Sequence, residues 1–413
     1  MPFKLQKIVM KCLINFSLLP LLCINLFASQ NVKKINMLEL QIDTINKKIE
    51  SLQVKNKGAL ELKNRDSVLS IGGRIQLHAI FSSPEYSSFN LAKIPITKSG
   101  EQNQLNTSAR ESRFWIKTRT PSEYGLISTL IELDFLGSKG TETTTNSHNP
   151  RLRHAYFNIN GFTIGQTNST FNPLVTLDTI SYAVNTLFVR QPLIRYSIKD
   201  EKIIYDFSFE QPETTLLNSS GEIVTPKDDL LPDFILRARY YPKWGNASIS
   251  LLARYLKQDL LEVGTRKDSA FAWGANISAK IKLLELDDFR FSAQYGQGLG
   301  RYMAYNAYPS ATLNKNGKIN PQTSYGIQAG YKHWWSTKLK STFALSYIAS
   351  ENNKEDLLTE DVNKEAYSIQ VNLFWTPAKN TLFGVEYADV KRTMLSEESG
   401  NSNMLIILSR YNF

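Results

Sequence analysis

The sequence predicts an all-β protein: a transmembrane antiparallel β-barrel of about 16 strands, preceded by a short N-terminal coiled-coil helix. Three observations predict this fold. Apolar and polar residues alternate along many short segments after residue 66, as in strands whose two faces meet different surroundings. The connections between these segments are alternately short and long. A heptad repeat of apolar residues precedes the first segment.

The composition of the 413-residue chain excludes several other classes. Gly (21) and Pro (15) are too few for a collagenous or Pro-rich disordered protein. No segment after residue 28 holds about 18 consecutive apolar residues, which excludes a bundle of transmembrane helices. The formal net charge is +10, and subtracting Lys4, Lys7 and Lys11 of an N-terminal targeting segment leaves +7. This charge is too low for a nucleic-acid-binding arm, so we expect no nucleic-acid partner.

Residues 1–28 are predicted to be an export signal peptide. Residues 4–11 carry three lysines, residues 12–27 are mainly apolar, and Ala28 offers a small residue for cleavage. An uncleaved membrane anchor and a lipoprotein site at Cys23 are the alternatives. Both cysteines of the chain lie in this segment, so the mature protein is expected to contain neither cysteine nor disulfide bonds.

Residues 31–56 are predicted to form a coiled-coil oligomerisation segment. Apolar residues recur every seven positions in two series, Ile35, Ile42 and Ile49 and then Leu38, Ile45 and Leu52. This is an a/d seam of about three heptads, which leaves open whether two or three helices associate. A single amphipathic helix packed on a domain would show the same apolar stripe. Residues 57–66 are interpreted as a linker.

Residues 67–413 are predicted to form the barrel. The predicted strands span residues 68–81, 110–120, 125–136, 150–160, 161–168, 187–199, 201–211, 232–242, 247–258, 269–282, 288–298, 321–335, 338–350, 364–377, 380–393 and 402–413. Long loops follow the odd strands, at 82–109, 137–149, 212–231, 299–320 and 351–363 among others, and short turns follow the even ones. An even strand count with this alternation is typical of a transmembrane β-barrel, in which a closed ladder satisfies every backbone group in lipid.

A soluble β-protein is the alternative, since its strands also alternate. Aromatic residues near the strand ends, such as Tyr240, Trp335 and Trp375, favour the membrane, because they resemble the girdles at lipid interfaces. The chain ends in an alternating strand with Tyr411 and Phe413, which resembles the assembly signal of bacterial outer-membrane proteins. We therefore expect outer-membrane lipid around the barrel, and the outer-membrane assembly machinery as a partner that binds Tyr411 and Phe413.

A barrel of about 16 strands encloses an aqueous channel, so its function is expected to depend on the charges of its inner face. The residues predicted to line the pore and bind solutes are Arg113, Lys117, Arg119, Glu132, Asp134, Arg151, Arg153, Arg190, Arg195, Arg237, Arg239 and Arg254. Arg190 and Arg195 differ in parity, which predicts a bulge near Pro192. Basic residues outnumber acidic ones, which favours anions. The alternative is that these charges pair with one another and stiffen the wall.

The loop 169–186 is unusually apolar for a segment facing water. It is predicted to fold into the barrel as a constriction loop, with Phe171, Asp178 and Tyr182 as candidate residues; packing at a subunit interface is the alternative. The four histidines show no metal-ligand spacing, and no nucleophile elbow or phosphate-binding loop is present. We therefore expect neither an enzyme nor a metal or other cofactor.

Several segments resemble the DcaP-like trimeric porin family of the bacterial outer membrane. The resemblance rests on Ser112–Phe114, Ile131–Gly137, Leu152–Phe157, Ile164–Phe171, Val189–Tyr196 and Tyr331–Leu339. It implies a homotrimer, joined by a three-stranded coiled coil, whose water-filled channels let small hydrophilic solutes diffuse passively, with a preference for anions such as dicarboxylates. It also implies lumen or constriction roles for Arg113, Glu132, Asp134, Arg153, Arg190 and Arg195. A membrane-anchored structural or adhesive barrel without transport is the alternative, and it would not need an arginine-lined lumen.

Overall fold

The computed structural model describes residues 59–61, 66–83, 103–137, 144–217, 223–226, 228–258, 267–314, 318–351 and 362–413. The predicted export signal and coiled coil lie outside these residues. Among the described residues, no helix combines the length and hydrophobicity needed to cross a membrane.

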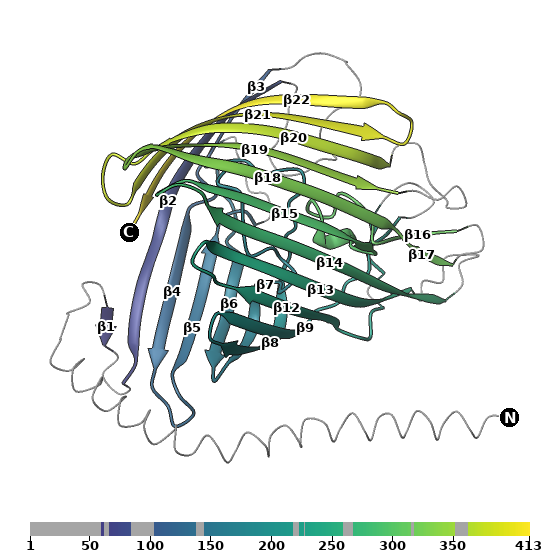
Figure 1. Cartoon of the computed structure of the whole chain (residues 1–413), viewed down its shortest axis with the longest axis horizontal. Helices are drawn as coiled ribbons and strands as arrows, with labels where there is room; N and C mark the ends of the chain where they lie inside the picture. Colours follow the sequence, from purple (N-terminus) through teal and green to yellow (C-terminus); the bar gives the residue numbers. More distant parts are fainter. Residues whose placement is uncertain are drawn as a thin grey trace. The chain divides into compact units, whose positions relative to one another are not determined.

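The strands of the unit Leu60–Phe413 form a closed antiparallel barrel (Figure 1). After the short β1 (Ala59–Glu61), the barrel strands are β2 (Val68–Ser83), β3 (Gln104–Ser108), β4 (Arg113–Thr120), β5 (Ile127–Asp134), β6 (Arg151–Ile159), β7 (Phe162–Asn168), β8 (Arg190–Asp200), β9 (Ile203–Glu210), β12 (Asp233–Tyr240), β13 (Gly245–Gln258), β14 (Asp268–Lys282), β15 (Asp288–Gln297), β18 (Thr323–Ser336), β19 (Leu339–Ser350), β20 (Asn363–Trp375), β21 (Thr381–Met394) and β22 (Ser399–Asn412). β2 pairs with both β3 and β4, each strand from β4 onward pairs with the next one named, and β22 pairs with β2 to close the sheet.

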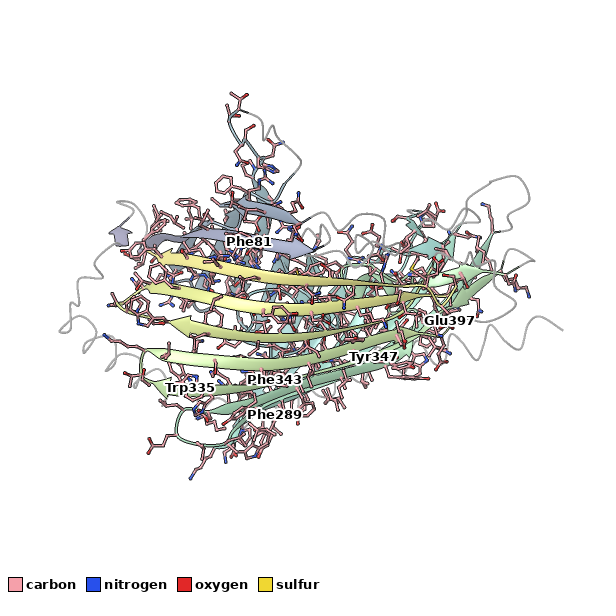
Figure 2. All side chains as sticks on the ribbon, turned by 90° about the horizontal axis from the view of Figure 1, so that it is seen from above. Phe81, Phe289, Trp335, Phe343, Tyr347 and Glu397 are labelled. Atoms are coloured by element: carbon pink, nitrogen blue, oxygen red, sulfur yellow. The ribbon has the colours of Figure 1, made fainter. Side chains whose placement is uncertain are left out.

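The predicted fold class is confirmed. Both β3 and β4 pair with β2, so they are two halves of one strand, broken at residues 109–112. Counted in this way, and without β1, the sheet of 18 segments contains 16 strands among the described residues. Short turns and longer loops alternate around the barrel, as predicted, except that the last connection, residues 395–398 between β21 and β22, is as short as the turns. In Figure 2, Trp335 lies near one end of the strands, beside the turn between β18 and β19. Glu397 lies near the other end, in the connection between β21 and β22.

The two faces of the wall have the polarity of a membrane protein. On β20, the outward residues Tyr367, Ile369 and Val371 are apolar and exposed, whereas the inward Ser368 and Gln370 are polar and buried. A soluble protein would bury the apolar face instead. The exposed apolar face and the polar interior are what lipid requires, which contradicts the soluble alternative.

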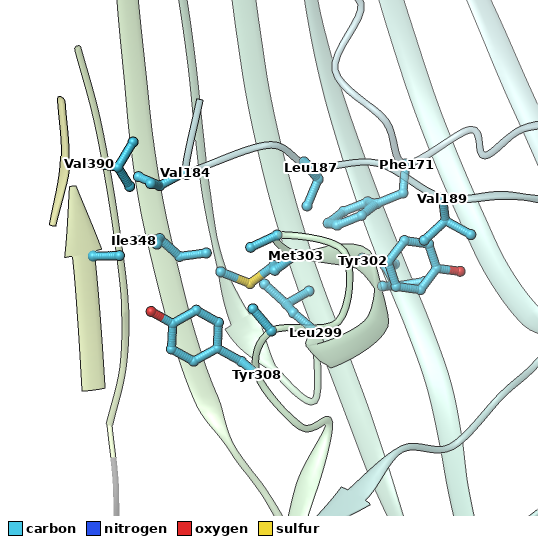
Figure 3. Packing of buried hydrophobic residues seen from close by; sticks show 14 of the residues in the cluster. Phe171, Val184, Leu187, Val189, Leu299, Tyr302, Met303, Tyr308, Ile348 and Val390 are labelled. Atoms are coloured by element: carbon cyan, nitrogen blue, oxygen red, sulfur yellow. The ribbon is translucent and has the colours of Figure 1, made fainter. Parts of the chain in front are cut away.

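Two long connections fold into the barrel and pack on each other. These are the β7–β8 loop, residues 169–189, and the β15–β18 loop, residues 298–322, which contains the 3-10 turn η2 (Gly300–Tyr302). The Phe188 amide donates to the Tyr302 carbonyl at 3.0 Å. Together with wall residues, the two loops form a buried apolar cluster (Figure 3) that includes Phe171, Leu187, Tyr302, Met303, Tyr308, Ile235, Ile348 and Met404.

A small four-stranded sheet lies among the loops. It consists of β10 (Leu216–Leu217), β11 (Ile223–Val224), β16 (Ala311–Leu313) and β17 (Ile319–Pro321). Because β16 pairs with β10, this sheet joins the β15–β18 loop to the β9–β12 loop. At the long-loop end, the β7–β8, β9–β12 and β15–β18 loops are therefore connected to one another inside the barrel.

Candidate functional site

The β7–β8 loop is held against the inner wall of the barrel by hydrogen bonds to its backbone. The amides of Ile180 and Ser181 donate to the Glu386 carboxylate of β21 at 2.6 and 2.7 Å. The Leu174 amide donates to Ser278 Oγ of β14 at 3.1 Å. These partners lie on strands far from β7 and β8 in the sheet order, so the loop crosses the interior of the barrel.

The three predicted constriction-loop residues have different surroundings. Phe171 is fully buried against Tyr302, with their ring centroids 5.5 Å apart, so it packs and does not face open space. Asp178 forms an ion pair with Lys340 of β19 at 2.5 Å. Tyr182 is 43% exposed and lines a cavity. Of the three, Tyr182 is therefore the side chain that a solute in this cavity would meet.

This cavity, called the inner cavity below, has a volume of about 430 Å³ and lies between the β7–β8 loop and strands β2, β4 and β22. Its charged lining residues are Arg74, Arg113, Arg410 and Glu111. Three guanidinium groups thus face one carboxylate. Gln76 and Ser181 add polar groups to a lining that also contains apolar side chains, so the charged groups are the part that suits an anionic solute.

Strand register brings the three arginines together. Arg74 on β2 lies directly opposite Arg113 on β4, and Arg410 on β22 lies opposite Gln76, two residues along β2. Arg410 Nε donates to Gln76 Oε1 at 2.7 Å, and Arg74 lies 3.7 Å from Glu111. Like charges directly opposite each other on neighbouring strands destabilise a sheet. The Arg74–Arg113 pair therefore breaks a rule of sheet stability at the cavity wall.

Arg74 and Arg410 are absent from the residues predicted from the sequence. Their parity was visible: Arg74 lies on the polar face of the first strand, and Arg410 lies between the apolar-face positions 409 and 411. The missing information was the closure of the barrel. Only the pairing of β22 with β2 places residues that are 334 positions apart in the sequence side by side.

A second group of predicted residues forms an ion-pair network on β5 and β6. Arg153 donates to Glu132 at 2.7 Å and to Asp134 at 2.6 Å, and Arg151 also binds Asp134, at 2.7 Å. Arg113 joins the network through Glu132 at 3.3 Å. For this group, the structure agrees with the alternative that the charged residues pair with one another within the wall and stiffen it.

The predicted bulge near Pro192 is wrong. Strand β8 pairs with β7 without a register break, and Pro192 lies opposite Gln166. A register shift occurs instead between Glu132 and Leu133, where β6 contributes Arg153 as an extra residue. A bulge turns consecutive side chains to the same side. Arg153 can therefore reach both carboxylates of β5.

A third group lies on β8, β9, β12 and β13. Asp206 accepts from Arg237 at 2.8 Å and from Arg239 at 2.7 Å, and Arg195 lies within electrostatic range of the same carboxylate. Arg254 is only 3% exposed. It pairs with Asp233 at 3.0 Å, and its remaining N–H groups donate to loop carbonyls, including that of Gly298 at 2.7 Å.

The prediction that Arg254 lines the pore is therefore corrected. Its side chain points inward, as parity required, but the β9–β12 and β15–β18 loops cover it, and it fastens these loops to the wall.

Lys117 and Arg119 are exposed near the short-turn end of β4, where Lys117 Nζ lies 4.2 Å from the centre of the Trp115 ring. Arg190 begins β8 at the long-loop end. Within the described ranges, no group of three or more His, Cys, Asp or Glu residues could hold a metal ion.

Comparisons with known proteins agree with this architecture. The crystal structure of the outer membrane channel DcaP of Acinetobacter baumannii matches with a TM-score of 0.76 and 22% identity, covering 86% of this chain and all (100%) of that one. An anion-selective porin from Comamonas acidovorans matches with a TM-score of 0.55 and 9% identity, covering 84% and 100%. OmpF of Salmonella typhi matches with a TM-score of 0.52 and 12% identity, covering 86% and 100%.

At the level of sequence, no curated protein matches the chain significantly. The model of one family, described as DcaP outer membrane protein, matches residues 32–413, which is nearly the whole chain. The chain therefore belongs to the DcaP outer membrane protein family, and it is a channel-type β-barrel of the bacterial outer membrane.

Proposed function

We propose that this channel is a porin for passive diffusion of small hydrophilic solutes, and that it prefers anions such as dicarboxylates. The observation that supports the preference most directly is the inner cavity, where Arg74 faces Arg113 across a strand pair and Arg410 lies beside them. A wall selected only for stability would not oppose two arginines. Local rules of this kind are broken mainly where function requires it.

The charge balance of the inner cavity supports the same proposal. Three arginines and one glutamate give its lining a net charge of +2. An anion about 4 Å from one guanidinium gains about 1–4 kcal/mol, depending on how much water surrounds the pair. Guanidinium groups also bind carboxylates through two parallel hydrogen bonds. Neighbouring arginines can therefore hold both ends of a small dicarboxylate while it passes.

The proposal includes a homotrimer in outer-membrane lipid. It is supported by the heptad repeat of residues 31–56 and by a structural relative, OmpT of Vibrio cholerae, which was solved in a trimer form and matches with a TM-score of 0.51. We also infer that Tyr411 and Phe413 bind the assembly machinery before the barrel closes. The wall residues are proposed to have no catalytic role.

Reversal potential in a planar bilayer across a KCl gradient tests the proposal. We expect the wild-type protein to show stepwise conductance with an anion-biased reversal potential. The double variant Arg74→Gln/Arg410→Gln changes the net charge of the cavity lining from +2 to 0, so its reversal potential should move close to zero. The matched control Lys243→Gln removes a charge in a short turn outside the cavity and should behave like the wild type.

Three outcomes would contradict the proposal in different ways. Folded protein without conductance would favour the structural or adhesive alternative. A cation-biased wild type would refute anion preference but keep the channel. An unchanged reversal potential in the double variant would show that the inner cavity does not set selectivity.

A further inference from the structure

A second cavity lies at the long-loop ends of β6 and β8 and is called the outer cavity here. Its volume is about 330 Å³, and its lining includes Arg151, Arg190 and Arg301 together with the rings of Phe188 and Tyr305. Among the described residues that line this cavity, none is acidic. Three cations therefore face one space that contains no carboxylate.

The three arginines differ in how far the protein already satisfies them. Arg151 is paired with Asp134, and Arg301 donates to Gln191 Oε1 and to the Gln211 carbonyl. Arg190 differs: within the described residues its guanidinium has no hydrogen bond and no ion pair, and its Nε atom is buried without a partner. Placing an unpaired cation in a partly buried, basic cavity costs free energy, and a bound anion would offset this cost.

Packing holds the Arg190 guanidinium in place at the cavity. It lies 5.1 Å from the centre of the Phe188 ring, a distance typical of a cation–π contact. The same ring also lines the inner cavity. The outer and inner cavities are thus neighbours that share one aromatic wall.

Three rings form this wall, which we call the aromatic partition. Tyr305 lies with its ring centroid 5.7 Å from that of Phe188 and 5.3 Å from that of Tyr182. Tyr305 comes from a turn in which three consecutive non-glycine residues have positive φ, at 46°, 54° and 63°. This conformation is disfavoured for L-residues and persists where surrounding structure imposes it. Here the Ala304 amide donates to the Thr186 carbonyl at 2.9 Å, which fixes the turn on the β7–β8 loop.

We propose that the outer cavity is a second anion-binding site, in which Arg190 is the main ligand of a carboxylate or phosphate group carried by a small solute. The aromatic partition separates this site from the inner cavity. The transport role of the site rests on the proposed porin function, since the site would then load anions before they pass the partition. Its binding chemistry does not depend on conduction.

Equilibrium binding tests the site directly. The purified protein in detergent is titrated by calorimetry with succinate and, separately, with inorganic phosphate at low ionic strength. Removal of a charge-assisted hydrogen-bond donor corresponds to a loss of about 10–100-fold in affinity. We therefore expect Arg190→Gln to lose one binding phase, Arg190→Lys to retain part of it, and Lys243→Gln to bind like the wild type.

The binding phase that does not depend on Arg190 is expected to come from the inner cavity. This phase should persist in Arg190→Gln and disappear in Arg74→Gln/Arg410→Gln. If Arg190→Gln and the wild type bound both anions equally, the inference would be overturned. Binding restricted to vesicles that contain a phosphate-bearing lipid would also overturn it, because the occupant would be a headgroup and not a solute.

Electrical recording tests the order of the two sites. Succinate added on the long-loop side should interrupt the current of the wild type, with interruptions at least about tenfold shorter in Arg190→Gln. Tyr305→Leu opens the partition and should remove the difference between the two sides of addition. A protein that binds succinate but carries no current would refute the porin function and leave the site intact. A conducting protein that lacks the Arg190-dependent phase would refute only the site.

Discussion

Glu386 on β21 is the tether of the β7–β8 loop, so Glu386→Gln is expected to release the loop without unfolding the barrel. The carboxylate is completely buried and accepts hydrogen bonds from the Ile180 amide, the Ser181 amide and the Ser181 hydroxyl at 2.5–2.7 Å. Asn372 Nδ2 donates a fourth, at 3.1 Å. Both oxygens are therefore occupied by donors.

The size of the effect follows from these contacts. Glutamine keeps one oxygen and replaces the other with an NH₂ group, which would face donors of the loop. Each hydrogen bond to a charged group contributes about 1.5–3 kcal/mol. The loss of two such bonds weakens the attachment of the loop by about 3–6 kcal/mol. The strand pairing of β21 with β20 and β22 is backbone-mediated and stays unchanged.

Hydrogen exchange with mass spectrometry and single-channel recording measure the release. In Glu386→Gln we expect faster exchange in peptides covering residues 174–185, a larger conductance and weaker anion selectivity. The matched control is Glu365→Gln on the neighbouring strand, whose carboxylate accepts from the Tyr347 hydroxyl at 2.6 Å. If Glu386→Gln matched the wild type in both exchange and conductance, the tether would be refuted.

Two further predictions concern stability. Arg153→Ala leaves two neighbouring carboxylates short of their shared partner, so the free energy of unfolding should fall by about 3–5 kcal/mol, which the temperature of barrel unfolding on gels would reveal; an unchanged temperature would contradict this. In the turn before β15, the hydrogen bond from the Tyr331 hydroxyl, followed by those from His333 and the Trp334 amide, lowers the pKa of Asp287 to about 2. Because its pKa is depressed in the folded state, Asp287 stabilises the fold above about pH 4, and this contribution is lost as the pH falls towards 2. Unfolding measured between pH 5 and 2 should be less pH-dependent in Asp287→Asn, and identical profiles would refute the assignment.

The wall of the barrel was predictable because its signal is local. Alternation along residues 364–377 predicts a strand that the structure places at Asn363–Trp375. Parity also gave the correct side for Arg254. It did not show what covers this side chain, because the covering loops come from distant parts of the chain. The site depends on such long-range contacts, and for this reason Arg410 was missed.

The bulge illustrates the same limit on a smaller scale. Pro192 marked a position where a ladder hydrogen bond is lost, and proline often accompanies an irregularity. The sheet accommodates Pro192 without a register shift, and a bulge occurs instead at Arg153. At that location Arg153 pairs with two carboxylates on β5, and these contacts between strands are not visible in the sequence of β6 alone.

The closure of β2 with β22 has a consequence for how the protein reaches its folded form. The Gly73 amide donates to the Phe413 carbonyl, and the Phe413 amide donates to the Gly73 carbonyl, both at 3.1 Å. The seam thus joins the beginning of the barrel to the last residue of the chain. Until it forms, two strand edges carry unpaired N–H and C=O groups that lipid cannot satisfy. Without β22, the edges of β2 and β21 would lose the strand that joins them. We therefore expect a chain truncated before β22 to expose two open strand edges, which are templates for aggregation.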